Sequence, residues 1–170
     1  MKWALFAGLV LFSACVPMAV LQPPEPVRGE RFTLGGSLFP APMSSPYPVW
    51  GLPYLSYAVG DGQKEFSLSF QAPLRLGAKV QLAEGLSLDG GVSLFVDLNQ
   101  GAVTGFSADV GLFLRMGRDF YFSPRLHRLP WGPLAPQLTL GYWGEGMAVE
   151  GGYGPGGPYL ALGLSFQSAP

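Results

Sequence analysis

The sequence predicts an all-β protein, an antiparallel up-and-down meander closed into a small barrel of eight to ten strands. Three observations carry this prediction. Apolar residues occupy nearly every even-numbered position from Phe66 to Met116, and the odd positions between them are mostly small or polar. This period of two is the signature of strands with one apolar face. Short loops interrupt the alternation without changing its phase, and no convincing helical pattern follows the N-terminal apolar run.

The loops within this stretch have the spacing that antiparallel hairpins require. Residues 83–85 (Ala-Glu-Gly) and 99–101 (Asn-Gln-Gly) each separate two alternating runs and end on Gly. Such a loop suits a type I turn followed by a left-handed residue, and it preserves parity across the hairpin. Residues 117–119 have the same spacing. Pro73 marks either a further tight turn or a bulge in one long strand.

Shorter alternating stretches flank the central meander. A first strand is expected to begin at Phe32, and a second to end near Val59. Residues 39–48 and 124–136 are rich in Pro and are expected to form two long loops. After the second loop, the expected elements are strands around 138–142 and 147–149, a four-residue loop at 143–146 and a last strand at 160–166.

The N-terminus has the features of an export signal. Lys2 precedes a short apolar run, which is too short to span a bilayer as a mature helix, and small residues follow. Residues 1–14 are therefore interpreted as a secretory signal peptide. Residues 11–15 (Leu-Phe-Ser-Ala-Cys) resemble the lipobox of bacterial lipoproteins. That resemblance implies lipidation of Cys15, and the alternative is an ordinary signal peptide with an incidental cysteine.

The three expected segments of the chain follow from this interpretation. The signal peptide covers residues 1–14. Residues 15–30 are expected to form a lipid-anchored, Pro-rich spacer that its charged residues keep solvated. Residues 31–167 form the β-barrel domain.

Composition argues against several classes of function. Charged residues make up 12% of the 170 residues, against about 25% in ordinary soluble domains. The net charge is -1 and no basic patch is visible, so no nucleic-acid partner is expected. One cysteine and one histidine cannot build a zinc site, so neither a metal nor a cofactor is expected. His127, with Arg125 and Arg128, is interpreted as a loop face near anionic headgroups, and no catalytic residue is expected.

The polar face favours a barrel that crosses a membrane. It carries mainly Ser and Gly, where a solvated face would carry many Lys and Glu. The longest runs, 86–98 and 102–116, reach the roughly 9–11 residues that a strand needs to cross a bilayer. Aromatic residues near strand ends are expected to form interfacial girdles: Trp50, Tyr54, Trp131, Tyr142 and Trp143. The alternatives are a sandwich and a periplasmic lipocalin-like barrel that binds a lipid or small apolar ligand inside.

The expected register brings charges together inside such a barrel. If Leu82 pairs with Leu86, then Lys79 lies opposite Asp89 on the polar face. Buried charges need partners. The hypothesis is a lumen ion network that plugs the barrel, made by Lys79, Asp89, Asp109, Arg75 and Asp97. In the same register Arg75 faces Ser93, Gln71 faces Asp97, and Asp109 faces Gly91.

Alternating strands, short Gly-bearing turns and long Pro-rich loops together resemble the small outer-membrane β-barrel proteins of bacteria with two membranes. The resemblance covers most of residues 31–167. It implies a cell-envelope lipoprotein inserted in or anchored to the outer membrane, with a structural or interaction role and no catalysis. Membrane lipid is the expected partner, and an envelope protein is a second candidate.

Overall fold

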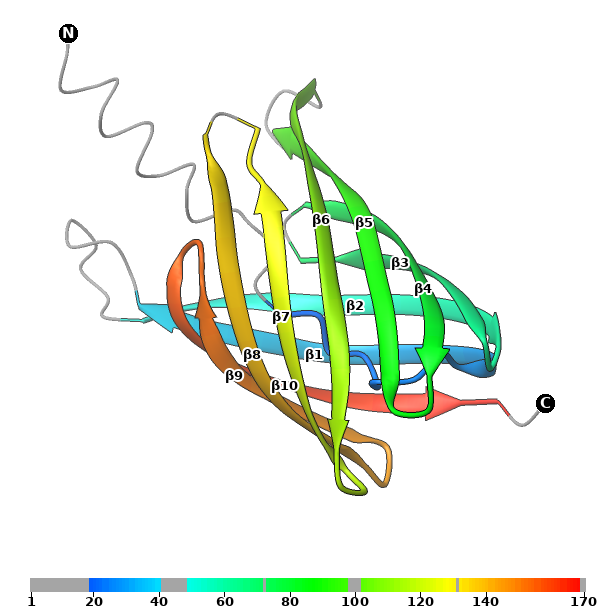
Figure 1. The fold of residues 1–170 in the computed structure, drawn as a ribbon. Helices are drawn as coiled ribbons and strands as arrows, with labels where there is room; N and C mark the ends of the chain where they lie inside the picture. The colour runs from blue at the N-terminus through cyan, green and yellow to red at the C-terminus, as the bar shows by residue number, and fades with distance from the viewer. Residues whose placement is uncertain (1–18, 41–48, 72, 98–101, 131, 169–170) are drawn as a thin grey trace, which may run out of the picture.

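The computed structural model describes residues 19–40, 49–71, 73–97, 102–130 and 132–168 of the chain. Within these ranges, ten antiparallel strands form one closed barrel (Figure 1). The strands are β1 (Arg28–Pro40), β2 (Val49–Asp61), β3 (Lys64–Phe70), β4 (Leu74–Ala83), β5 (Leu86–Asp97), β6 (Ala102–Met116), β7 (Phe120–Arg128), β8 (Leu134–Gly144), β9 (Met147–Gly154) and β10 (Gly157–Gln167). No helix among the described residues is long and apolar enough to cross a membrane.

The strands follow a simple meander, and this confirms the predicted fold class. Each strand pairs with its neighbours in the sequence, and β1 closes the ring against β10. The closing register runs from Arg31 opposite Gln167 to Leu38 opposite Leu160. Closure leaves no unpaired edge, which removes the aggregation hazard of an open sheet.

The turns largely follow the predicted chemistry. Lys79 pairs with Asp89 as expected, but Leu86 pairs with Ala83 and not with the expected Leu82, because a bulge after Gln81 shifts the register before the turn, where Gly85 has φ 71°. Phe70 pairs with Leu74, so Pro73 belongs to a tight turn and not to a bulged long strand. Met116 pairs with Phe120 around Gly117, which has φ 74°. The expected turn at 99–101 lies outside the described residues.

Several boundaries differ from the sequence-based expectation. β1 begins at Arg28, ahead of the expected Phe32. The expected loop at 124–136 is largely strand, because β7 continues through Pro124 to Arg128 and β8 begins at Leu134. Pro124 is tolerated because no β6 partner pairs with it in the ladder, although Leu138 of β8 lies opposite it.

The expected four-residue loop at 143–146 is also wrong. Gly144 pairs with Met147, which leaves a two-residue turn of Glu145 and Gly146. Both residues have positive φ, 53° and 77°, as a type I′ hairpin turn requires. This turn accounts for the shift of apolar residues from even to odd positions in β9.

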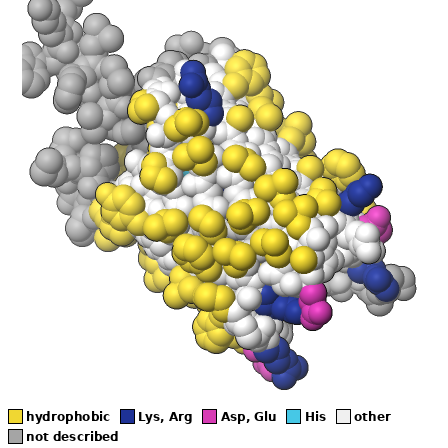
Figure 2. Space-filling view, in the orientation of Figure 1, with side chains coloured by type: hydrophobic (Ala, Val, Ile, Leu, Met, Phe, Trp, Pro, Cys, Tyr) yellow, Lys and Arg dark blue, Asp and Glu magenta, His cyan; other side chains and the backbone are white. Residues whose placement is uncertain are grey.

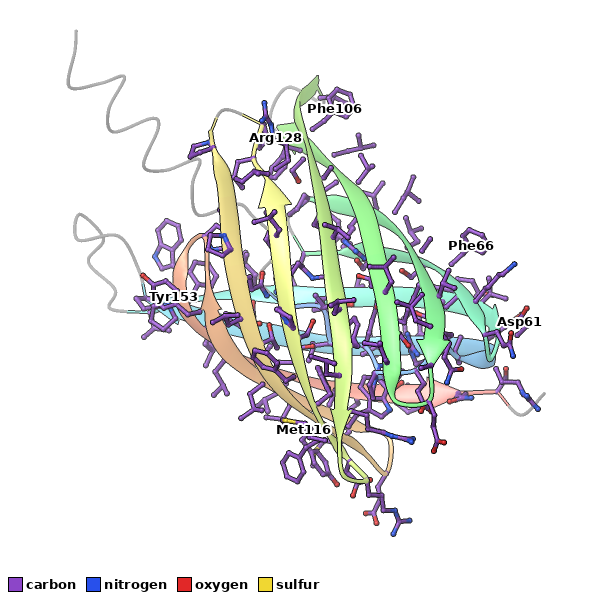
Figure 3. All side chains as sticks on the ribbon, viewed as in Figure 1. Asp61, Phe66, Phe106, Met116, Arg128 and Tyr153 are labelled. Atoms are coloured by element: carbon purple, nitrogen blue, oxygen red, sulfur yellow. The ribbon has the colours of Figure 1, made fainter. Side chains whose placement is uncertain are left out.

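The two faces of the barrel have opposite character. Large apolar side chains from all ten strands point outward and are exposed, so the visible outer surface is covered by hydrophobic groups (Figure 2). The labelled Phe66, Phe106, Met116 and Tyr153 project away from the ribbon (Figure 3). The inward positions are mainly Ser, Thr, Gln, Arg, Lys, Asp, Glu and Tyr, and they are buried. The barrel is therefore polar inside and apolar outside.

Candidate functional site

The lumen contains a balanced set of buried charges. Eight charged side chains of the described residues are buried there, four cationic and four anionic: Arg31, Arg75, Lys79, Arg125, Glu65, Asp89, Asp109 and Glu150. Each stands on an inward position of a strand, because alternate residues of one strand face the same side. Buried charges are tolerated only when paired and hydrogen-bonded, so their partners define the site.

Four of these charges form one cluster on β4–β7. Arg75 Nη2 lies 2.7 Å from Asp89 Oδ2 and 2.8 Å from Asp109 Oδ1, and Arg75 Nε donates to Asp109 Oδ2 at 2.9 Å. Arg125 Nη2 lies 2.6 Å from Asp89 Oδ2, and Arg125 Nη1 also pairs with Asp109. We call Arg75, Asp89, Asp109 and Arg125 the ion cluster. The sequence predicted three of its members, and Arg125 was missed.

Lys79 belongs to a second group. Its predicted position opposite Asp89 is correct in register. Among the described residues, however, its salt-bridge partner is Glu65, with Nζ 3.7 Å from Oε1, because Arg75 and Arg125 already hold Asp89. Arg31 Nη2 also binds Glu65, at 3.0 Å. The ammonium group of Lys79 lies 4.5 Å from the centre of the Phe113 ring, which adds a cation–π contact.

Of the remaining predictions for the ion network, some are confirmed and one is untested. Arg75 faces Ser93 and Asp109 faces Gly91, as predicted. Asp97 pairs through its backbone with Ala102 at the end of β5, but its side chain lies outside the described part of the structure. Its membership in the network stays a prediction.

Residues 19–27 lie inside the barrel, where we expected a solvated spacer. Ala19, Leu21, Gln22 and Val27 are each at most 3% exposed, and the segment runs through the lumen (blue before β1 in Figure 1). The Pro and charged residues suggested solvation. The apolar residues between them have no regular period, so the sequence carried no sign that the segment is buried. We call residues 19–27 the plug.

The plug enters near one end of the barrel and reaches β1 at the other. The backbone N–H of Ala19 donates to Gln71 Oε1 at 3.2 Å, beside the β3–β4 turn. At the opposite end, Val27 N donates to Glu65 Oε2 at 2.8 Å, and Gly62 N donates to Val27 O at 2.9 Å. The plug therefore threads most of the length of the lumen.

Glu150 on β9 holds the first part of the plug. Its Oε2 accepts the N–H of Val20 at 3.0 Å, and its Oε1 accepts the N–H of Leu21 at 2.7 Å. Tyr121 Oη donates to the same Oε1 at 2.5 Å. The hydroxyl of Tyr54 donates to the carbonyl oxygen of Val20. Leu21 has φ 42°, a conformation that non-glycine residues rarely adopt and that surrounding contacts must maintain.

The later part of the plug is held from the other side. Lys79 Nζ donates to the carbonyl oxygen of Pro23 at 2.8 Å, and Gln22 Nε2 donates to Ser67 Oγ at 3.3 Å. Glu25 accepts a salt bridge from Arg115 Nη1 at 2.8 Å. Lys79 thus links the buried charges to the backbone of the plug.

The predicted aromatic girdle is only partly on the outer face. Tyr142 faces outward, with its ring 5.4 Å from that of Phe120. The prediction that Tyr54 is an interfacial residue is wrong. Even-numbered positions of β2 point inward, and Tyr54 is 2% exposed. Trp143 packs inside against the core and lies under Arg31, and Trp50 packs against the same core. Trp131 lies outside the described residues.

The expected headgroup-binding loop is also wrong. Arg125 and His127 are buried in the lumen because β7 continues through this segment, and only Arg128 is exposed. His127 Nε2 is 2.8 Å from Gln137 Oε1 on β8. Among the described residues, no group of three or more His, Cys, Asp or Glu side chains could hold a metal ion.

Sequence reasoning missed Arg31, Glu65, Arg125 and Glu150. A signal was present, because each falls on the polar phase of its strand. Glu65 precedes the outward Phe66, and Glu150 follows Val149 after the parity switch. The partner of Glu150 could not be read in the same way, because the plug that binds it is about 130 residues away in the chain.

Comparison with known proteins gives no family assignment. No family model matches the chain, and no curated protein matches it. Among solved structures, a KdgM porin is 11% identical, with a TM-score of 0.46 over 82% of this chain and 99% of that chain. A KdgM porin in complex with disordered oligogalacturonate is 10% identical, with the same score and coverage. Likeness at this level carries no argument about function.

Proposed function

We propose that this protein is a membrane-spanning β-barrel of the bacterial outer membrane, with a structural or interaction role and no catalysis. The observation that carries the proposal is the reversed polarity of the barrel. Its outer face exposes large apolar side chains from every strand, while its charges are paired inside. In water, an apolar surface of this extent would aggregate. In a bilayer it is the surface that lipid requires.

The lengths of the strands support the same proposal. β1 and β2 have 13 residues each, and β6 has 15. A tilted strand needs roughly 9–11 residues to cross a bilayer. The polar, charge-lined lumen weighs against the lipocalin-like alternative, because that barrel would need an apolar interior to hold a lipid.

We further propose that Cys15 is lipidated, as the lipobox resemblance implies. It is four Cα–Cα steps from Ala19, which limits the distance between the two Cα atoms to roughly 14 Å. Because Ala19 lies toward the end of the barrel that carries the β3–β4 turn, acyl chains on Cys15 would enter the leaflet at that end. Membrane lipid is then the first partner, and an envelope protein the second candidate.

The experiment that tests the spanning barrel compares two outward leucines. Leu140 lies near the middle of β8, and Leu82 lies beside a turn, with nearly equal exposure of 55% and 56%. In a bilayer, Leu140→Arg should destabilise the fold by about 2–4 kcal/mol and Leu82→Arg by about 0–1, because the effect depends on depth. Urea unfolding of residues 16–170, refolded into lipid vesicles, measures both. A chain that stays monodisperse without detergent, and in which both variants are neutral, would contradict the proposal.

A further inference from the structure

The plug bridges opposite walls of the barrel. In the closed ring, β9 and β4 are five strands apart in either direction. Glu150 on β9 binds the plug at Val20 and Leu21, and Lys79 on β4 binds it at Pro23. The ion cluster, by contrast, joins the adjacent strands β4–β7, so it follows the wall. The plug therefore connects opposite walls that the ion cluster does not join.

Glu150 depends on the plug more than the other buried acids do. Glu65, Asp89 and Asp109 each form salt bridges to basic side chains. Among the described residues, Glu150 has no basic nitrogen within 4.0 Å, and it accepts two backbone N–H groups of the plug and the hydroxyl of Tyr121. The plug also holds Leu21 at φ 42° to present these two N–H groups. The two plug N–H groups therefore occupy the Glu150 carboxylate as a bound ligand would.

Loss of this ligand would leave a space lined by many polar groups. The walls carry four buried cations and four buried anions, together with Ser56, Ser67, Ser69, Ser87, Ser93 and Thr139. A peptide chain occupies about 5 Å by 10 Å in cross-section, by the spacings between strands and between sheets. That width exceeds the diameter of a water molecule, so the vacated space would admit water and small ions.

We propose that residues 19–27 are a displaceable plug, an internal ligand of Glu150 whose release turns the closed barrel into a channel for small ions. The inference rests on the proposed membrane-spanning function. With equal numbers of cations and anions on its walls, the open channel discriminates weakly between anions and cations. The barrel also accepts an extended peptide of the plug sequence as a ligand supplied from solution.

The test uses the chain from residue 16 to 170 in planar lipid bilayers. In the first variant, residues 19–26 are replaced by Gly and Ser at equal length. Wild-type protein should show no steady current, and the variant should raise conductance at least tenfold at equal protein. A synthetic peptide with the sequence of residues 19–27 should then return the current to the wild-type value.

A second variant keeps the plug intact. Glu150→Gln removes the charge that the two N–H groups bind and preserves the shape, so brief openings should appear several-fold more often than in wild type. The matched control is Glu145→Gln in the adjoining turn, where the side chain is exposed, and its current should equal that of wild type.

Insertion is scored separately, by circular dichroism and by resistance of the vesicle-bound barrel to protease. A replacement variant that inserts as a barrel and does not conduct overturns the plug proposal, and the spanning barrel stands. If that variant fails to insert while wild type does, Glu150→Gln decides: channel openings support the plug, and an inserted silent barrel overturns it. Wild-type protein that never inserts overturns the proposed function and the plug with it.

Discussion

The two sides of the lumen solve the problem of buried polar groups in different ways. On β4–β7, two arginines and two aspartates bind one another across adjacent strands. On β1, β2, β9 and β10, the aromatic residues Phe39, Tyr54 and Tyr159 lie in one cluster with Ala19 and Leu21 of the plug. The ion cluster is complete without the plug, whereas the aromatic cluster includes residues of the plug.

This difference suggests that the ion cluster is rigid and that the plug can be replaced. Paired charges in a low-dielectric interior stabilise one arrangement and strongly penalise the loss of one partner. A carboxylate such as Glu150 that accepts backbone N–H groups recognises no particular side chain, so another segment of the same conformation could bind there. The ion cluster is therefore expected to maintain the fold, and the plug side to permit change.

The largest effect is expected when the ion cluster is disrupted. Asp89→Ala removes the partner of Arg75 and Arg125, whose guanidinium groups lie 2.7 and 2.6 Å from the same oxygen. Loss of one member of a buried ion pair should lower the free energy of unfolding by about 3–5 kcal/mol. Urea unfolding in vesicles, followed by tryptophan fluorescence, measures it.

A surface carboxylate supplies the control for that experiment. Asp119 lies in a turn, 3.9 Å from the exposed Arg118, so Asp119→Ala should change stability by about 0–1 kcal/mol. Equal losses in the two variants would show that the ion cluster contributes no more than a surface pair.

The second expected effect weakens the plug side. Glu150→Gln replaces one of two accepting oxygens by an NH₂ group that faces a backbone N–H, which should cost about 1–3 kcal/mol. Amide hydrogen exchange at Val20 and Leu21 should accelerate, while exchange in β5 stays near its wild-type rate. Uniform acceleration over the barrel would contradict the separation of the two sides.

Two glycines allow a steric comparison of the ion cluster with the site that binds the plug. A Cβ at Gly141 would collide with the ring of Tyr121, the hydrogen-bond donor to Glu150. A Cβ at Gly91 would lie 2.6 Å from Arg75 Nε, so the Arg75 guanidinium group would have to shift within the ion cluster. A guanidinium group at the end of a long side chain shifts more easily than an aromatic ring, so Gly141→Ala should destabilise by about 1–3 kcal/mol and Gly91→Ala by less.

Gly90→Ala is the matched control for these variants. An added Cβ there would meet only the Asp109 carbonyl oxygen, at 3.4 Å, so thermal unfolding should change little. If Gly91→Ala lowers stability more than Gly141→Ala does, Arg75 is held more rigidly than Tyr121.

The smallest expected effect concerns the partner of Lys79. A double-mutant cycle of Lys79→Met with Glu65→Gln should give a coupling of about 1 kcal/mol, because the two groups form a salt bridge. The cycle with Asp89→Asn should give less than about 0.5 kcal/mol, since Asp89 is held by two arginines. The reverse ranking would favour Asp89, the register partner of Lys79 on β5.

That last pair shows how far sequence reasoning reaches. The register that placed Lys79 opposite Asp89 was correct, and so was the position of Arg75 opposite Ser93. Register fixes which Cα atoms are neighbours, but a long lysine or arginine chain reaches the next strand as easily as its own partner. Glu65 on β3 is itself the register partner of Lys79 on its other side, and Arg125 on β7 reaches Asp89 two strands away.

Aromatic residues show a second limit. Proximity to a strand end placed Tyr54 and Trp143 in the expected girdle, yet the side they face follows from parity within their own strands. Tyr54 shares its phase with the inward Ser56, and Trp143 pairs with the inward Ala148. A parity count through the correct Glu145–Gly146 turn would have placed Trp143 inside.

By itself, the sequence determined the strands, most of their turns and which residues face outward. These properties are local, because period-two alternation and the left-handed preference of glycine act over a few residues. Tertiary structure alone decided which of several possible partners each buried charge binds, and it decided the threading of residues 19–27 through the lumen. The threading depends on groups far apart in the chain, as with Val20 and Glu150, which meet only once the ring of strands has closed around the plug.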